Sequence, residues 1–392
     1  MTTYAVSGLG MMGTAIAFDL LLFDLNSKVI GLEFDTYRIE KAKEKLHQFQ
    51  ERFIPILTDI TSSNDPKKHP ILDILKEYSV STVFGAIDYK YNFFFSQICI
   101  YAQVNYLDLG GNPEVVHQQR KLNSEAEKAN IVILPDCGLA PGLANIIAAQ
   151  RMKHFESVDN CHIRVGGLPQ NPKTILNYQQ VFSIRGLTNE YLEDAIILHD
   201  SKKVVVPSLS DVEELIFPEP WGKLEAFQTS GGTSSLPDIY EGKIKHLTYK
   251  TIRFPGHYQF FKFLKDFELL SSDPCPNCPN TNPREIIEYY LEKNLPKNAP
   301  DAVLVRISIN GIKNGKHIIE QLQLIDLADT HSGFSAMART TAFPTSIIGQ
   351  LITKGIISKK GVLMHELVVP EDEFTLELEK RNIKFVIEAK NF

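Results

Sequence analysis

The segment Thr248–His257 carries the residues best suited to binding a carboxylate and moving a proton. Alternation along a strand places Thr251 and Arg253 on one face and Lys250 on the other, and Pro-Gly then lets His257 turn out of the strand. Arginine can bind a carboxylate bidentately, and histidine titrates near neutral pH. We therefore expect Arg253 and Thr251 to bind substrate and His257 to transfer a proton. The alternatives are a surface ion pair for Arg253 and a hydrogen-bonded turn histidine for His257.

Two more substrate candidates lie at the ends of residues 178–184, which we predict to be a strand. Tyr178 begins this segment, and Arg185 follows it as a second possible ligand for a carboxylate. Arg164, by contrast, is equally consistent with a structural ion pair.

Asp136 is the second catalytic candidate. It follows the β-branched run 131–134 and precedes a helix that we expect to open at Pro141. A helix N-terminus beside it would lower the pKa of its carboxyl, which suits the binding of an ammonium group more than proton abstraction. The alternative is an aspartate that only caps a turn.

A glycine-rich motif near the start predicts a dinucleotide site. Gly8-Leu-Gly10-Met-Met-Gly13 follows a short strand and opens a helix, which is the order that the dinucleotide fingerprint requires. Glu33 ends the next strand about 20 residues later, where a carboxylate can accept both ribose hydroxyls. This placement favours NAD over NADP, although Arg38 leaves NADP open, and a solvated strand end is the alternative for Glu33.

The usual path of this fold adds residues that follow later strands, near the adenine and the nicotinamide. The predicted cofactor-binding residues are Gly8, Gly10, Met11, Met12, Gly13, Glu33, Phe34, Asp59, Ile60, Ala86, Ile87, Asp88, Tyr89 and Gly110.

The elements that position these residues predict an α/β domain followed by an α+β domain. Strands alternate with helices over residues 1–135, which indicates a doubly wound Rossmann domain of six parallel strands. Over 136–335 strands outnumber helices, and Asn314-Gly315 predicts a hairpin, so we expect a catalytic and dimerisation domain with a mostly antiparallel sheet. Residues 189–197 suggest a helix. The segment 336–392 contains an apolar helix at 337–353 and should pack back on the Rossmann domain.

Composition excludes several classes of function. A net charge of −6 gives no basic field for nucleic acid, and no stretch suggests a membrane span or an export signal. Five cysteines, an odd number, point to reduced thiols in a cytoplasmic protein. Cys275 and Cys278 form a CxxC pair, but the chain offers no second pair, so we expect no bound metal.

Seven motifs together resemble the saccharopine dehydrogenase-like family, and within it the chain is most similar to lysine 6-dehydrogenases. The motifs are Gly8-Leu-Gly-Met-Met-Gly13, Asp108-Leu-Gly-Gly-Asn112, Pro135-Asp-Cys-Gly-Leu-Ala-Pro-Gly-Leu-Ala-Asn145, His162-Ile-Arg-Val-Gly-Gly-Leu-Pro-Gln170, Gly222-Lys-Leu-Glu-Ala-Phe227, Lys250-Thr-Ile-Arg-Phe-Pro-Gly-His257 and Ala336-Met-Ala-Arg-Thr-Thr-Ala-Phe-Pro344.

The resemblance implies NAD-dependent oxidative deamination of the ε-amine of L-lysine, a small-molecule amino-acid substrate, and a homodimer or dimer of dimers. Two other functions stay open. One is a dehydrogenase acting on a secondary amine, of the saccharopine or carboxynorspermidine type. The other is a non-catalytic NAD-binding regulator.

Overall fold

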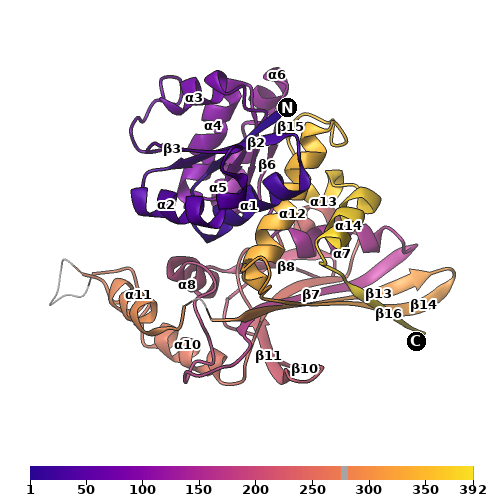
Figure 1. Cartoon of the computed structure of the whole chain (residues 1–392). Coiled ribbons are helices and arrows are strands. Elements are labelled where there is room, and N and C mark those ends of the chain that lie inside the picture. Colours follow the sequence, from indigo (N-terminus) through magenta and orange to yellow (C-terminus); the bar gives the residue numbers. More distant parts are fainter. Residues whose placement is uncertain (275–280, 298, 392) are drawn as a thin grey trace. The chain divides into compact units, whose positions relative to one another are not determined.

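The chain forms two compact units in this computed structural model, which describes residues 1–274, 281–297 and 299–391 (Figure 1). The first unit combines residues 1–147 with 338–383, and the second combines 148–337 with 384–392.

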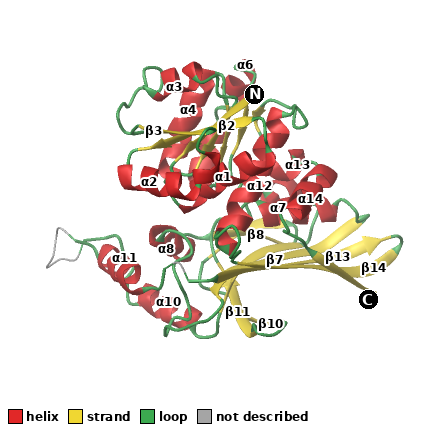
Figure 2. Ribbon diagram, in the orientation of Figure 1, coloured by secondary structure: helices red, strands yellow, loops and turns green. Residues whose placement is uncertain are grey.

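A parallel sheet forms the centre of the first unit, with helices on its faces (Figure 2). The strand order is β15-β6-β5-β4-β1-β2-β3, and every pair in it is parallel. The predicted Rossmann fold is therefore confirmed, and in the described chain a short seventh strand from the C-terminal segment extends it beside β6. The strands are β1 (Thr2–Ser7), β2 (Ser27–Glu33), β3 (Phe53–Leu57), β4 (Thr82–Gly85), β5 (Asn105–Asp108), β6 (Val132–Leu134) and β15 (Gly361–Val362).

The helices of the first unit follow from caps and apolar surfaces in the sequence. Helix α1 is largely buried, whereas α2 is mostly exposed and is capped by Asp35, whose side chain accepts from the backbone N–H of Tyr37 at 2.8 Å. The sequence of residues 114–129 predicts one helix, but this segment forms two separate helices, α5 and α6. The helices are α1 (Met11–Phe23), α2 (Thr36–Lys45), α3 (Ile71–Glu77), α4 (Asn92–Ala102), α5 (Pro113–Arg120), α6 (Asn123–Lys128), α7 (Leu143–Met152), α12 (Ala336–Thr353), α13 (His365–Val368) and α14 (Glu371–Lys380), with 3-10 turns η1 (His47–Phe49) and η2 (Tyr89–Tyr91).

A buried ion pair joins the C-terminal segment to α1 inside the first unit. The guanidinium of Arg381 donates to both carboxylate oxygens of Asp19 at 2.7 and 2.8 Å, and the hydroxyl of Ser346 donates to Asp19 at 2.6 Å. Both charged side chains are fully buried. Removing Arg381 would leave the carboxylate of Asp19 in the interior without its charged partner.

The second unit is built on a mixed, mostly antiparallel sheet in which only β12 and β7 pair in parallel among the described strands. Its main order is β10-β11-β12-β7-β13-β14-β16, and β8 and β9 extend it from β12. The predicted hairpin is confirmed, since β13 and β14 pair as far as Lys313 and Lys316 around Asn314-Gly315. The strands are β7 (Ser157–Pro169), β8 (Ala195–His199), β9 (Lys202–Val206), β10 (Glu213–Phe217), β11 (Gly222–Gln228), β12 (His246–Arg253), β13 (Asp301–Lys313), β14 (Lys316–Leu327) and β16 (Val386–Asn391).

Among the described residues, four helices lie wholly within the second unit, and α8 lies beside α11 (Figure 1). They are α8 (Ile184–Leu192), α9 (Leu236–Tyr240), α10 (His257–Asp266) and α11 (Pro283–Asn294).

The predicted strand at 178–184 is wrong. Residue 180 makes one isolated bridge to residue 297, and α8 begins at Ile184 because the hydroxyl of Ser183 caps it by accepting from the N–H of Gly186 at 3.1 Å. The helix expected at 189–197 is accordingly displaced, since α8 ends at Leu192 and β8 follows.

The helix predicted to open at Pro141 begins two residues later, at Leu143. Gly142 has a φ of 130°, which a helix cannot contain, and its N–H donates to the side chain of Asn145 at 3.0 Å. Asp136 therefore lies seven positions before Leu143, the first helical residue, and is not at the N-terminus of this helix in the sequence.

Reduced thiols were expected from the cysteine count, and Cys99, Cys137 and Cys161 are buried free thiols. Of the helices in the described ranges, none has the length and apolar character needed to cross a membrane.

Candidate active site

The glycine loop of the first unit has the form of a dinucleotide cradle. A Cβ on Gly8 would lie 2.5 Å from the carbonyl oxygen of Ala86, and one on Gly13 would lie 1.8 Å from that of Gly8. These two glycines permit close packing of the loop and α1. A Cβ on Gly10 would meet no protein atom within 4 Å. Packing inside the unit therefore does not require a glycine at this position, and the missing side chain leaves space for a ligand. In the described chain, Gly10 at the N-cap of α1 offers no capping side chain, and the N-terminus of such a helix is suited to binding a phosphate.

Glu33 is held beside this loop by backbone donors. Its carboxylate accepts from the N–H of Leu9 at 2.7 Å, and from the N–H groups of Phe34 and Asp35 at 2.9 and 3.1 Å. The side chain of Glu33 is only 1% exposed, and a guanidinium nitrogen of Arg38 lies 4.0 Å from it. The negative charge at the end of β2 is thus fixed in place next to the cradle, where it disfavours a further phosphate group.

The ends of β4, β5 and β6 bring a third group of predicted residues together. A Cβ on Gly110 would lie 2.1 Å from a carboxylate oxygen of Asp136, and one on Gly111 would lie 3.2 Å from the side chain of Tyr89. Asp136 is buried, with a φ of 64°, and its N–H donates to the carboxylate of Asp108 at 3.4 Å. Burial raises the pKa of Asp108 to about 6. Asp136 therefore lies at the carboxyl edge of the sheet, where α/β proteins bind ligands.

The remaining predicted cofactor residues lie in the loops that follow β1, β2, β3 and β4, at the same edge of the sheet. Met11 begins α1 and is 44% exposed, Phe34 is 61% exposed, and Asp59 accepts from the N–H of Thr61 at 2.8 Å. The others in these loops and in α1 are Met12, Ile60, Ala86, Ile87 and Asp88.

In the second unit, Arg253 is buried, and none of the described carboxylates pairs with it. The residue is 2% exposed, its Nε donates to the hydroxyl of Tyr191 at 2.9 Å, and Nη1 donates to the carbonyl of Ile252 at 3.0 Å. The guanidinium lies 5.1 Å from the ring centre of Tyr178. Within the described part of the chain, Nη2 has no hydrogen-bond partner and no acid forms an ion pair with Arg253. A buried cation with open donors is suited to binding an anionic group.

His257 belongs to the same cluster, and both of its ring nitrogens have partners. Nε2 lies 3.0 Å from the hydroxyl of Tyr191, and Nδ1 lies 3.0 Å from the carbonyl oxygen of Leu176. Because a carbonyl can only accept, Nδ1 donates to it and Nε2 accepts from Tyr191. Burial, followed by the charge of Arg253, lowers the pKa of His257 to about 3. At neutral pH this histidine is a neutral, fixed partner of Tyr191.

Strand β12 separates two polar groups on its faces, as the alternation predicts. The hydroxyl of Thr251 is buried and lies 2.7 Å from that of Thr229. Lys250, on the opposite face, forms ion pairs with Asp211 at 2.9 Å and Glu213 at 3.0 Å. Glu213 is also paired with Arg164, so Arg164 belongs to this ion-pair network and not to the Arg253 cluster.

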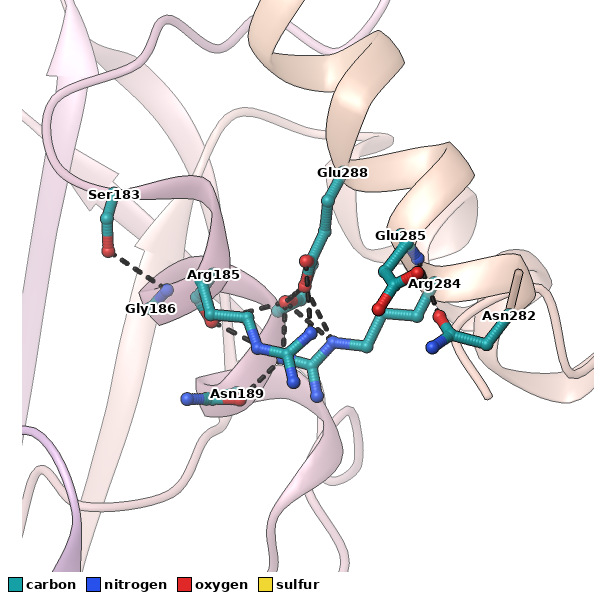
Figure 3. Close-up of polar contacts among 9 residues, drawn as sticks. Ser183, Arg185, Gly186, Asn189, Asn282, Arg284, Glu285 and Glu288 are labelled. Carbon is teal, nitrogen blue, oxygen red and sulfur yellow. Dashed lines mark hydrogen bonds and ion pairs between the residues drawn. The ribbon is translucent and has the colours of Figure 1, made fainter. Parts of the chain in front are cut away.

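Arg185 lies in a different environment from Arg253. Its side chain is 51% exposed on α8 and pairs with Glu288 of α11 at 3.1 Å. Figure 3 shows the surrounding network of Arg185, Arg284 and Glu288. Glu288 also accepts from Arg284 at 2.6 Å, and Arg284 donates to the hydroxyl of Thr188 at 2.6 Å. The pocket beside this network has a volume of about 360 Å³ and is lined by Gln180, Ser183, Ile184, Arg185, Glu285, Glu288, Tyr289 and Glu292.

The second unit thus gathers Arg253, Thr251, Tyr178 and His257 in or next to β12, and leaves Arg185 in an acidic pocket. Tyr191, whose hydroxyl joins Arg253 to His257, was not among the residues predicted from the sequence. The reason is that the helix containing Tyr191 was predicted at residues 189–197, whereas α8 spans Ile184–Leu192.

We predicted that the CxxC pair binds no metal. Cys275 and Cys278 lie outside the described residues, so this stays a prediction. Among the residues that are described, no group of three or more His, Cys, Asp or Glu side chains is arranged to hold a metal ion.

Comparison with known proteins gives a consistent result. The family model described as "Saccharopine dehydrogenase C-terminal domain" matches residues 138–383. The apo saccharopine dehydrogenase (L-Glu forming) from Saccharomyces cerevisiae is similar over 100% of both chains, with a TM-score of 0.78 and 17% sequence identity. A probable dehydrogenase from Thermotoga maritima is matched over 97% of this chain and 94% of its own, with a TM-score of 0.44 and 10% identity. The similarity to the yeast structure shows a shared fold.

Proposed function

Because the chain belongs to the saccharopine dehydrogenase C-terminal domain family, we propose that it is an amino-acid dehydrogenase that uses a nicotinamide dinucleotide. The family match covers more than half of the chain, and the fold of the first unit is that of dinucleotide-binding domains. The fixed charge of Glu33 beside the glycine loop supports NAD as the dinucleotide.

The substrate that we propose is L-lysine, oxidised at its ε-carbon. The observation that carries this proposal is the buried guanidinium of Arg253, which has no ion-pair partner among the described residues, because a carboxylate is the anionic group that every α-amino acid supplies. Thr251 and Tyr178 complete the polar surroundings of Arg253 in this proposal. Arg185, paired with Glu288 and half exposed, can at most guide a charged substrate from solvent.

The glycine loop Gly8–Gly13 and Glu33 would hold the dinucleotide, which would supply the acceptor for a hydride from Cε of lysine. The substrate must first lose an ammonium proton, because only the free amine can form the imine, and water then adds to the imine and releases ammonia. The resulting 2-aminoadipate 6-semialdehyde closes on its own α-amine, with loss of water, to Δ1-piperideine-6-carboxylate. In this proposal the carboxylate of Asp136 orients the amine or the attacking water, since it is buried at the carboxyl edge of the first sheet.

His257 was predicted to transfer the proton, and its environment supports a positioning role instead. A group with a pKa of about 3 is a weak base, and its lone pair already accepts from Tyr191. We assign it the task of holding the hydroxyl of Tyr191 against Nε of Arg253. His257→Gln should then raise KM for lysine more than it lowers kcat.

A second candidate function is the oxidation of a secondary amine such as saccharopine. It is supported by the similarity in fold to a saccharopine dehydrogenase over the full length of both chains. The test is to follow reduction of NAD and of NADP at 340 nm with lysine, saccharopine, carboxynorspermidine and cadaverine. Our proposal requires NADH formation with lysine. Reduction with saccharopine alone would favour the second candidate, and no reduction with any amine would favour a non-catalytic binding protein.

A further inference from the structure

Glu225 of β11 caps helix α10, which follows the neighbouring strand β12. The helix begins after Gly256, which has no side chain that could accept from the first N–H groups. The carboxylate of Glu225 takes this place, since it accepts from the N–H of Tyr258 at 2.7 Å and from that of Gly256 at 3.2 Å. A carboxylate here also interacts favourably with the positive end of the helix dipole. Glu225 therefore fixes the start of α10 to β11.

Glu225 makes these contacts although it lies opposite Arg253. The register of β11 and β12 pairs the two residues, so their side chains leave the same face of the sheet on adjacent strands. Opposite charges in such cross-strand positions attract each other. Here both oxygens of Glu225 accept from backbone N–H groups instead, and Arg253 donates to Tyr191 and to the carbonyl of Ile252. The cap on α10 thus engages the neighbouring acid and leaves Arg253 to another anion.

The two capped N–H groups lie on either side of His257. Because His257 is the first residue of α10, the cap at Gly256 and Tyr258 determines where its ring lies. Nε2 of His257 accepts from the hydroxyl of Tyr191 at 3.0 Å, and this hydroxyl accepts from Nε of Arg253 at 2.9 Å. A shift of the capped turn would therefore reach the guanidinium through two hydrogen bonds.

We propose that Glu225 is a positioning residue of the carboxylate-binding site. By holding the start of α10 it fixes His257 against Tyr191, and Tyr191 in turn orients Arg253 toward the α-carboxylate of the substrate. The inference rests on the proposed function, which supplies the ligand of Arg253. It also gives a role to the motif Gly222–Phe227, to which Glu225 belongs and which the proposed function does not use.

The test is a double-mutant cycle, measured by calorimetric binding of L-lysine to the intact protein with NADH present. In E225Q the amide oxygen can accept from one backbone N–H, but the amide NH2 group faces the other donor, so half of the cap is lost. E225Q should bind L-lysine about 5-fold more weakly than the wild type, because one hydrogen bond is worth roughly that factor. In an H257Q background, E225Q should add less than about 2-fold, because both changes act through the same hydrogen bonds.

One further ligand and two variants control the experiment. Cadaverine lacks the carboxylate, so E225Q should bind it within about 2-fold of the wild type, whereas a general loss of structure would weaken both ligands. E214Q changes the glutamate opposite Glu225 on β10, whose exposed side chain pairs with Lys223 at 2.6 Å, and should bind L-lysine as the wild type does. E225D keeps the charge on a shorter side chain and should lie between the wild type and E225Q, which also serves if E225Q folds poorly.

A measurement without substrate separates this inference from the proposed function. Nitrogen NMR of protein labelled with 15N-histidine reports the tautomer of His257, and H257Q assigns its signal. The wild type should show one neutral tautomer, protonated at Nδ1, and E225Q should show a mixture because the ring is released from Leu176 and Tyr191. If the chain did not act on lysine, no NADH would form with lysine, yet this change of the His257 signal would remain.

The inference is overturned if E225Q binds L-lysine as tightly as the wild type, if the affinities for L-lysine and cadaverine fall equally, or if the loss adds in full to that of H257Q. An unchanged His257 signal in E225Q would overturn it as well, since the position of the ring would then not depend on the cap.

Discussion

Replacing two glycines of the same loop, one at a time, separates cofactor binding from folding. Gly10 has a φ of −71°, which alanine adopts freely, and its added Cβ meets no atom within 4 Å. Alanine is a poorer N-cap than glycine, so G10A should change the free energy of unfolding by no more than about 1 kcal/mol. Gly13 lies inside α1, where a Cβ would be 1.8 Å from the carbonyl oxygen of Gly8. Overpacking of this kind costs about 2 kcal/mol.

The expected melting temperatures follow from these free energies. At about 2–4 °C per kcal/mol for units of this size, G13A should melt roughly 4–8 °C below the wild type and G10A within a few degrees of it. Binding of NADH, measured by calorimetry, should nevertheless weaken about 10-fold or more in G10A, because the Cβ occupies the space through which a pyrophosphate reaches the backbone. Wild-type affinity in G10A, or a melting temperature as low as that of G13A, would refute this account of the cradle.

Three further predictions concern other parts of the chain. R381M leaves the carboxylate of Asp19 buried without its partner, so urea unfolding should show a loss of about 3 kcal/mol or more, and a loss below about 1 kcal/mol would contradict the buried pair. Burial, and then the charge of Arg164, lowers the pKa of His162 to about 4. Between pH 6.5 and 4 the imidazole of His162 is therefore protonated more readily in the unfolded chain than in the folded one. The folded state consequently loses stability as the pH falls through that range. H162Q should therefore reduce the difference in unfolding free energy between pH 7 and pH 5 by about 2 kcal/mol, and an unchanged difference would refute the assignment. R253M should weaken binding of L-lysine at least about 10-fold, as seen by calorimetry, and leave that of cadaverine, which lacks the carboxylate, within about 2-fold; equal losses would argue against a carboxylate at this site.

Local patterns in the sequence were sufficient to predict the first sheet and the β13–β14 hairpin. Gly13 packs against the backbone of Gly8 in the same short motif, and Asn314-Gly315 defines a tight turn by itself. These features depend on neighbours in the sequence, so a single sequence reveals them.

The second unit was harder because its contacts are long-range. Residues 178–184 have the composition of a strand, but the cap at Ser183 starts a helix there instead. Arg185 and Arg253 look equally suited to a carboxylate in the sequence. They differ in burial and in the ion pair of Arg185 with Glu288, which lies 103 positions after Arg185. Likewise, the hydrogen-bond partners of His257 are Tyr191 and Leu176, 66 and 81 positions away, so its buried and fixed position could not be anticipated from its own segment.

The central claim is that the protein transfers hydride from Cε of lysine to a nicotinamide. Its most direct test uses L-lysine labelled with deuterium at C6 or at C2, with NAD, and mass spectrometry of the NADH formed. We predict NADH that carries one deuterium from C6-labelled lysine and none from C2-labelled lysine, together with the cyclic product Δ1-piperideine-6-carboxylate. Deuterium from C2, or no NADH from lysine under conditions in which the protein binds NAD, would contradict the claim.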